Sequence, residues 1–231
     1  VIALITAALT FTMTVCGSLT AAAASELTAE SKPATQYTID ANQEVYALLD
    51  FEDTAEFENA TKGQIASPDT LDIYDENGKL VWSQTAYAFL DQDTANPSLW
   101  RDTQLNHIYG LFEVTDGIYQ VRGYDMSNVT FIKGDTGWIV VDPLMSVECA
   151  QAALALVEEN LGTFPVKAVI YSHSHVDHFG GVKGIVSEEE VQAGNVQVIA
   201  PEGFEKHAVS ENIYAGTAMG RRASYQYGTM L

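Results

Sequence analysis

Three histidines and one aspartate fall close together in this chain: His173, His175, Asp177 and His178. The whole chain has five histidines, so more than half of them lie in one short segment. Neutral imidazole nitrogens and carboxylate oxygens are ligands that zinc, iron and manganese accept from proteins. Residue types and spacing therefore predict a transition-metal site. The alternative is a solvated histidine-rich loop.

The cluster follows an apolar, strand-like stretch at residues 166–170. Side chains two positions apart on an extended segment point the same way, so His173 and His175 can bind one ion. Asp177 and His178 lie where the chain should turn away from its strand. They could hold a second ion beside the first.

Two glycines, Gly180 and Gly181, follow the cluster and would let the backbone pass close to a bound group. Two ions held about 3.5–4 Å apart form a hydrolytic centre, in which a shared water loses its proton near neutral pH and attacks an ester. The motif, the preceding strand and the trailing glycines agree. Together they predict a metal-dependent hydrolase.

Asp142 ends another predicted strand and has two interpretations. A carboxylate beside a histidine cluster commonly orients a ligand imidazole through its second ring nitrogen. An aspartate directly before Pro143 is equally typical of a turn. The local sequence leaves both interpretations open.

Strands and helices alternate through the second half of the chain, as an α/β layered fold requires. A helix starting at Ser146 has an apolar face that should cover a sheet, and Gly162 closes it. Ser187 and Glu190 form a capping box for a short helix that ends near Gly194. Strands are predicted at residues 118–122, 129–133, 138–141 and 196–200.

The first half of the chain has weaker patterns. Residues 25–40 are linker-like, and residues 42–49 and 55–62 look helical. Two short strands at 72–82 flank Glu76-Asn77-Gly78, a strong hairpin signal. We expect residues 25–105 to form an N-terminal arm that packs on a core domain at residues 106–231.

The HxHxDH pattern after a strand resembles the metallo-β-lactamase superfamily, whose fold is a four-layer αββα sandwich with metals at the mouth of its two sheets. The flanking segments look like the alkylsulfatase branch of that superfamily. The resemblance implies a zinc enzyme with two ions that hydrolyses linear alkyl sulfates, such as dodecyl sulfate, to an alcohol and inorganic sulfate. The segments that carry it are 51–57, 81–90, 97–101, 110–112, 117–123, 137–143, 200–204, 210–212 and 218–223.

This resemblance also implies carboxylate and histidine ligands located well after the motif. The 53 residues after His178 contain one histidine, His207, on a segment at 202–213 that looks helical. The chain begins with valine and no basic region precedes its apolar start, which is typical of an internal piece. We therefore expect an N-terminal fragment of the sandwich that is inactive by itself. Homodimers are implied for the full-length protein alone.

The chain is strongly acidic, with 31 acidic and 11 basic residues and a formal net charge of -20. This charge argues against nucleic-acid binding, which needs basic surface. It would also repel an anionic sulfate ester, so a sulfate site must be locally cationic, from metal and arginine. Arg221, beside Arg222, is the candidate sulfate-binding residue, with a solvated helix end as the alternative.

The first 25 residues carry no charge. We interpret residues 1–24 as a signal peptide cleaved near Ser25, so the protein should be secreted or periplasmic. Gly17, Ser18 and several threonines weaken the alternative of a membrane anchor. Lipidation at Cys16 has a weak signal, and Cys149, on the apolar face of a helix, is interpreted as a packing residue.

Three other functions stay open at this point. Another hydrolase of the superfamily would share HxHxDH without the flanking segments. A non-catalytic metal-binding module would suit a chain without later ligands. An acidic binding protein would hold no metal at all.

Overall fold

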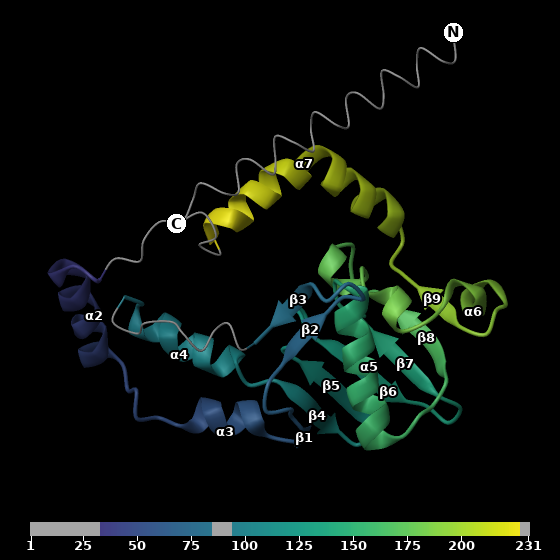
Figure 1. Cartoon of the computed structure of the whole chain (residues 1–231), viewed down its shortest axis with the longest axis horizontal. Helices are drawn as coiled ribbons and strands as arrows, with labels where there is room; N and C mark the ends of the chain where they lie inside the picture. The colour runs from purple at the N-terminus through teal and green to yellow at the C-terminus, as the bar shows by residue number, and fades with distance from the viewer. Residues whose placement is uncertain (1–32, 85–93, 227–231) are drawn as a thin grey trace, which may run out of the picture. The chain divides into compact units, whose positions relative to one another are not determined.

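The computed structural model describes residues 33–84 and 94–226, in two compact units. Of the described residues, 34–213 form one unit, and Pro33 and residues 214–226 belong to the other. The first contains the sheet (Figure 1) and the predicted metal ligands at residues 173–178. The predicted signal peptide and Cys16 lie outside the described residues. No helix in the described ranges is long and apolar enough to cross a membrane.

A seven-stranded mixed sheet is the centre of the larger unit. Along this sheet the pairs β1–β4, β4–β5, β5–β6 and β6–β7 are antiparallel, and the pairs β7–β8 and β8–β9 are parallel. The observed β5, β6 and β7 confirm the predicted strands at 118–122, 129–133 and 138–141. In sheet order the strands are β1 (Gln64–Ala66), β4 (Gly110–Thr115), β5 (Ile118–Arg122), β6 (Val129–Lys133), β7 (Trp138–Val141), β8 (Val166–Ile170) and β9 (Gln197–Ile199).

Alternating side chains give the sheet one fully buried face. Val129 and Phe131 of β6 are buried, whereas Thr130 between them is half-buried. Phe131 pairs with Val140 across the ladder, and both side chains are fully buried. This face belongs to the hydrophobic core, where removing a phenylalanine side chain costs about 3–5 kcal/mol.

The helix α5 (Val147–Leu161) lies across the sheet in Figure 1 and packs on this core. Its start is capped by Ser146, whose hydroxyl accepts from Cys149 N at 3.1 Å. Gly162 closes it with φ 92°. Cys149 is buried, and burial raises the pKa of its thiol to about 12. The predicted amphipathic helix and the packing role of Cys149 are confirmed.

The N-terminal segment begins with α2 (Gln36–Leu48), so the predicted linker at 25–40 is wrong from Gln36 onward. The hydroxyl of Thr35 accepts from Thr38 N and caps the helix, which begins six residues before the predicted start at residue 42. A second helix, α3 (Ala55–Thr61), confirms the helical pattern predicted at 55–62. The hairpin of β2 (Asp72–Tyr74) and β3 (Leu80–Ser83) is also confirmed.

Among the elements up to β4, three were not predicted: α4 (Pro97–Asn106), β1 and β4. Because β1 pairs antiparallel with β4, residues 64–66 form part of the main sheet. The division into an arm at 25–105 and a core from 106 stays a prediction, although one strand of the arm joins the core sheet.

Four short or terminal elements follow β8: η2 (Val176–His178), η3 (Val182–Gly184), α6 (Glu188–Gln192) and α7 (Phe204–Gln226). The capping box of α6 is formed as predicted. The segment predicted to be helical at 202–213 is helical from Phe204, and α7 continues beyond it.

The parallel strands β7, β8 and β9 end at one edge of the sheet. Asp142 follows β7, and its N–H donates to Ile170 O at 3.0 Å. Tyr171 follows β8, and its N–H donates to Ile199 O at 2.9 Å. Loops at the carboxyl ends of parallel strands are where α/β sheets bind ligands. This edge brings Asp142 and the histidine cluster together.

Candidate metal centre

The turn after β7 has an unusual backbone. Asp142 and Leu144 adopt φ values of 55° and 62°, and they are the two described residues other than glycine with positive φ. A non-glycine residue held in a sparsely populated conformation costs about 1–3 kcal/mol and persists where surrounding contacts over-determine it. Such strained turns cluster at functional sites. This one directs the Asp142 carboxylate toward the loop after β8.

The Asp142 carboxylate connects the two loops through three hydrogen bonds. Its Oδ1 accepts from Ser172 N at 2.7 Å, and its Oδ2 accepts from Ser172 Oγ at 2.6 Å. The same Oδ2 lies 2.9 Å from His178 Nδ1, which donates to it. With a proton on Nδ1, the Nε2 of His178 has a free lone pair. The structure therefore shows features of both interpretations of Asp142: its carboxylate binds His178 Nδ1, and its backbone adopts the left-handed conformation of a turn.

His173 and His175 approach each other closely. His173 Nε2 lies 3.1 Å from His175 Nδ1. Two ligands of one tetrahedral ion, with bonds of about 2.0–2.1 Å, have nitrogens about 3.3 Å apart. The two histidines are therefore spaced as ligands of a single ion, although the strand ends at Ile170 and the segment after it is irregular.

Ser172 orients His173 in turn. Its hydroxyl donates to Asp142, so its oxygen accepts from His173 Nδ1 at 2.8 Å. This chain of hydrogen bonds leaves the lone pair of His173 on Nε2, the atom that faces His175. Outer hydrogen bonds of this kind fix the tautomer and the orientation of a metal-binding imidazole.

Asp177 and His178 lie together on η2, with His178 Nε2 3.3 Å from Asp177 Oδ2. The ring centroids of His178 and His173 lie 4.1 Å apart, with the ring planes tilted by 49°. The structure thus brings all four predicted ligands together as two adjacent pairs. Their roles as ligands remain a prediction.

The donor set fits a transition metal because the two pairs offer imidazole nitrogen and carboxylate oxygen at ligand spacing. Ligand atoms of Asp142, His173 and His178 also lie within 4.8 Å of one another. Asp142 could in principle bind an ion as well. Its two oxygens already accept three hydrogen bonds, so we interpret it as the orienting carboxylate.

Two residues of the site had no role in the sequence analysis. Ser172 had a weak signal, its place between the strand and the first histidine. Glu211, on α7, lies with Oε1 3.4 Å from His175 Nε2, on the ring nitrogen opposite the one facing His173. No local pattern connects Glu211 with the motif. Arg221 is exposed and lies in the other unit, so its sulfate role stays a prediction.

The glycines after the motif have a different purpose from the one expected. A Cβ on Gly180 would lie 2.3 Å from Met145 O, and one on Gly181 would lie 2.3 Å from Pro143 O. Gly181 N also donates to Leu144 O at 2.9 Å. The glycines therefore let the loop pack on the strained turn after β7, and the expectation that they also let the backbone pass close to a bound group stays a prediction.

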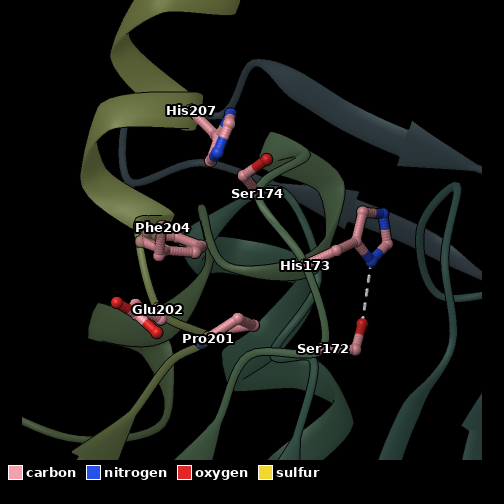
Figure 2. Close-up of a pocket in the computed structure, with 7 residues that line it drawn as sticks. All are labelled: Ser172, His173, Ser174, Pro201, Glu202, Phe204 and His207. Carbon is pink, nitrogen blue, oxygen red and sulfur yellow. Dashed lines mark hydrogen bonds between the residues drawn. The ribbon is translucent and has the colours of Figure 1, made fainter.

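A pocket opens beside His173, between the loop after β8 and the start of α7 (Figure 2). Phe204 packs there against Tyr171, with 5.2 Å between ring centroids, and burial raises the pKa of Tyr171. The lining combines apolar and titratable side chains. Its residues are Ser172, His173, Ser174, Pro201, Glu202, Phe204 and His207.

Comparison with known proteins gives a consistent result. The metallo-β-lactamase superfamily model matches residues 122–228. A linear primary-alkylsulfatase from Pseudomonas sp. is 52% identical over 206 residues, covering 87% of this chain and 31% of the relative. An alkyl/aryl-sulfatase from Saccharomyces cerevisiae is 50% identical over 198 residues, covering 84% and 31%.

A solved structure agrees with these matches. The stereoselective inverting sec-alkylsulfatase from Pseudomonas sp. superposes with a TM-score of 0.80 at 52% identity, over 87% of this chain and 32% of that chain. The chain thus spans about a third of the length of the relatives it matches.

Proposed function

We propose that the protein is a metal-dependent alkylsulfatase of the metallo-β-lactamase superfamily, whose model matches residues 122–228. It would hydrolyse an alkyl sulfate ester to an alcohol and inorganic sulfate. The carrying observation is the 50–52% identity to characterised alkylsulfatases over 84–87% of this chain. That identity extends well beyond the metal-binding motif, which by itself selects no substrate.

We propose zinc as the metal, with two ions. His173 and His175 would hold one, and Asp177 and His178 the other, supported by the spacing of 3.1 Å and 3.3 Å within the pairs. When bound, such ions supply Lewis-acid chemistry, lowering the pKa of water and offsetting negative charge on the ester oxygens.

The other residues of the chain prepare this site. Asp142 holds His178 directly and His173 through Ser172, so one carboxylate orients a proposed ligand of each ion. Because the chain is acidic overall, the anionic sulfate needs local positive charge. The metal ions and Arg221 are proposed to provide it.

The decisive experiment is substrate turnover by the purified full-length protein. We expect sulfate release from dodecyl sulfate, loss of that activity on chelation, and its recovery with Zn²⁺. Metal analysis should give two zinc ions per chain. Nitrocefin and a glutathione thioester serve as control substrates. Turnover of either control without sulfate release would overturn the alkylsulfatase proposal in favour of another hydrolase of the superfamily.

A non-catalytic metal-binding module is the second candidate. It is favoured by one observation: among the described residues, each proposed ligand pair supplies two donors, fewer than the four of a tetrahedral zinc ion. Stoichiometric zinc without any sulfate release would support this candidate.

We also propose that the protein is exported, because its first 25 residues are uncharged and rich in apolar and small side chains. N-terminal sequencing of the mature protein should find a start near Ser25. An unprocessed N-terminus in the cytoplasmic fraction would overturn this proposal. Homodimerisation, implied by the resemblance for the full-length protein, is tested by its mass in solution.

A further inference from the structure

The connection between β5 and β6 contains two buried polar side chains that the proposed chemistry leaves without a role. Asp125 and Ser127 are 7% and 8% exposed. In the ranges that the structure describes, Gln84 is the other polar residue counted as buried. Burying a carboxylate is costly unless hydrogen bonds stabilise its charge. A buried Asp125 therefore needs a physical explanation.

Backbone N–H groups stabilise the charge of Asp125. Its Oδ2 accepts from Met145 N and Ser146 N, each at 3.1 Å, and its Oδ1 accepts from Met126 N at 2.7 Å. Met145 and Ser146 lead directly into α5, whose N-terminal dipole also favours negative charge. No Lys or Arg of the described ranges forms a salt bridge with this carboxylate.

These contacts immediately follow the strained turn. Leu144 has φ 62°, and the next two N–H groups are the ones that Asp125 binds. On its other side the turn is held by Gly181 N, which donates to Leu144 O. A strained conformation persists where neighbours over-determine it. Asp125 is one of those neighbours, and the turn it holds presents Asp142.

Ser127 reaches the other loop of the site. Its hydroxyl donates to the backbone carbonyl of Asp177, across 50 positions of sequence. Asp125 and Ser127 are two positions apart on one connection, so the same short segment contacts both the turn of Asp142 and the helix η2 that carries Asp177 and His178.

We propose that Asp125 and Ser127 are positioning residues that together fix the Asp142 carboxylate relative to the Asp177–His178 pair. The inference rests on the proposed metal-binding function and deepens it. Neither residue touches a ligand side chain in the contacts described. Each acts through the backbone of a loop that carries one.

Asp125→Asn is the sharpest variant because it preserves shape and replaces one acceptor oxygen by a donor. The amide can satisfy either Met126 N or the pair on Met145 and Ser146, but not both sets. We expect metal affinity to fall about 10–100-fold, as for other partners that orient ligands from outside the coordination sphere. Ser127→Ala should give a smaller loss, and Ser127→Thr, which keeps the hydroxyl, should restore part of it.

The chain offers matched controls away from the site. Asp75 Oδ1 accepts from Asn77 N at 2.9 Å and Lys79 N at 2.8 Å in the β2–β3 turn, so Asp75→Asn removes similar contacts there. Ser187→Ala removes an exposed hydroxyl contact at the start of α6. Both controls should leave metal affinity unchanged.

The experiment measures Zn²⁺ affinity of the purified apo-protein by competition with a chromophoric chelator, and the visible spectrum of the Co²⁺ form. Thermal unfolding of each apo-variant establishes that it is folded. Weaker Zn²⁺ binding and an altered Co²⁺ spectrum in Asp125→Asn, with an unchanged Asp75→Asn, are the expected results. A folded Asp125→Asn variant with wild-type affinity and spectrum would overturn the proposal.

Two further outcomes also have a definite interpretation. If Asp125→Asn does not fold, the Zn²⁺ affinities of Ser127→Ala, Ser127→Thr and Ser187→Ala decide between the outcomes. Equal affinities in these three variants would refute the positioning role. If the unmodified protein binds no metal, the proposed function fails at that step. Failure of the positioning proposal is recognised separately, because there the unmodified protein binds metal normally.

Discussion

The start of α6 and the loop after β8 are built in opposite ways. At α6, Ser187 Oγ accepts from Glu190 N at 3.2 Å, and Glu190 Oε2 accepts from Ser187 N at 2.9 Å, so the partners are three residues apart. In the loop after β8, the orienting contacts join Ser172 and His178 to Asp142 across 30 and 36 positions.

This difference separates what a motif determines by itself from what the fold must supply. A capping box contains both partners, so its geometry follows wherever the helix forms. The HxHxDH motif contains the ligands without the groups that orient them. Its geometry depends on distant loops whose closure costs entropy, and the sheet provides that closure by placing β7 and β8 side by side.

The largest expected effect comes from removing a proposed ligand. His173→Ala deletes one of two nitrogens spaced 3.1 Å apart, and we expect at least about a 100-fold loss of metal affinity, the upper end seen for outer partners. Sulfate release should be lost with it. Metal content by mass spectrometry and turnover of dodecyl sulfate measure these losses.

His107→Ala is the matched control for that variant. His107 Nδ1 lies 3.2 Å from Gln84 Oε1, away from the motif, so its loss should leave metal content unchanged. The far-UV circular dichroism of His173→Ala should match the unmodified protein, because helices such as α6 form independently of the site. Full metal content in His173→Ala would refute the ligand assignment.

Asp142→Asn should have the next largest effect and separates the two interpretations of this residue. Asparagine tolerates the left-handed backbone of Asp142, so the turn is kept while one acceptor oxygen is lost. We expect metal affinity to fall about 10–100-fold with little change in the melting temperature of the apo-protein. If the residue served the turn alone, affinity would be unchanged. Chelator competition and thermal unfolding measure the two quantities.

The fold was predictable wherever a local pattern repeats. The strands β6 and β7 were predicted with their observed bounds because buried and less buried residues alternate along both strands. In β4, by contrast, Gly110, Leu111 and Phe112 are buried in succession. Without alternation the strand has no recognisable period, and neither β4 nor its partner β1 could be predicted.

The proposed ligands could be predicted from the sequence, whereas the residues that hold and orient them could not. Histidine and aspartate spacing is visible in the sequence, so the four converging side chains were found. Glu211 and Asp125 are recognisable only after α7 and the β5–β6 connection are folded. The glycines show the same limit, because their close neighbours are the backbone oxygens of Pro143 and Met145, which no local pattern reveals.

Glu211→Gln should weaken metal binding a few-fold, less than Asp142→Asn. The contact of Glu211 with His175 is long at 3.4 Å, and the His175 side chain is 57% exposed. Exposed ion pairs are weak and screened by salt. The difference from the unmodified protein should therefore shrink between low salt and about 1 M salt, where the Debye length is about 3 Å. Salt-dependent chelator competition tests this, with Glu189→Gln, which removes an exposed charge on α6, as the control. A deficit that does not change with salt would contradict the electrostatic explanation.

The smallest effect is expected at α6, where contacts are local and exposed. The N–H and the hydroxyl of Ser187 lower the pKa of Glu190 below its ordinary value of 4.5. A lowered pKa in the folded state adds stability above the ordinary value, and that stability is lost as pH falls through the lowered one. Ser187→Ala should therefore lower the melting temperature of the apo-protein slightly at pH 7 and by less at pH 3.

Its Co²⁺ spectrum at pH 7 should equal that of the unmodified protein, because no orienting contact of the metal loop passes through α6. A changed spectrum would show that the capping box and the metal loop are coupled, and that the capping box is not the self-contained unit its hydrogen bonds indicate.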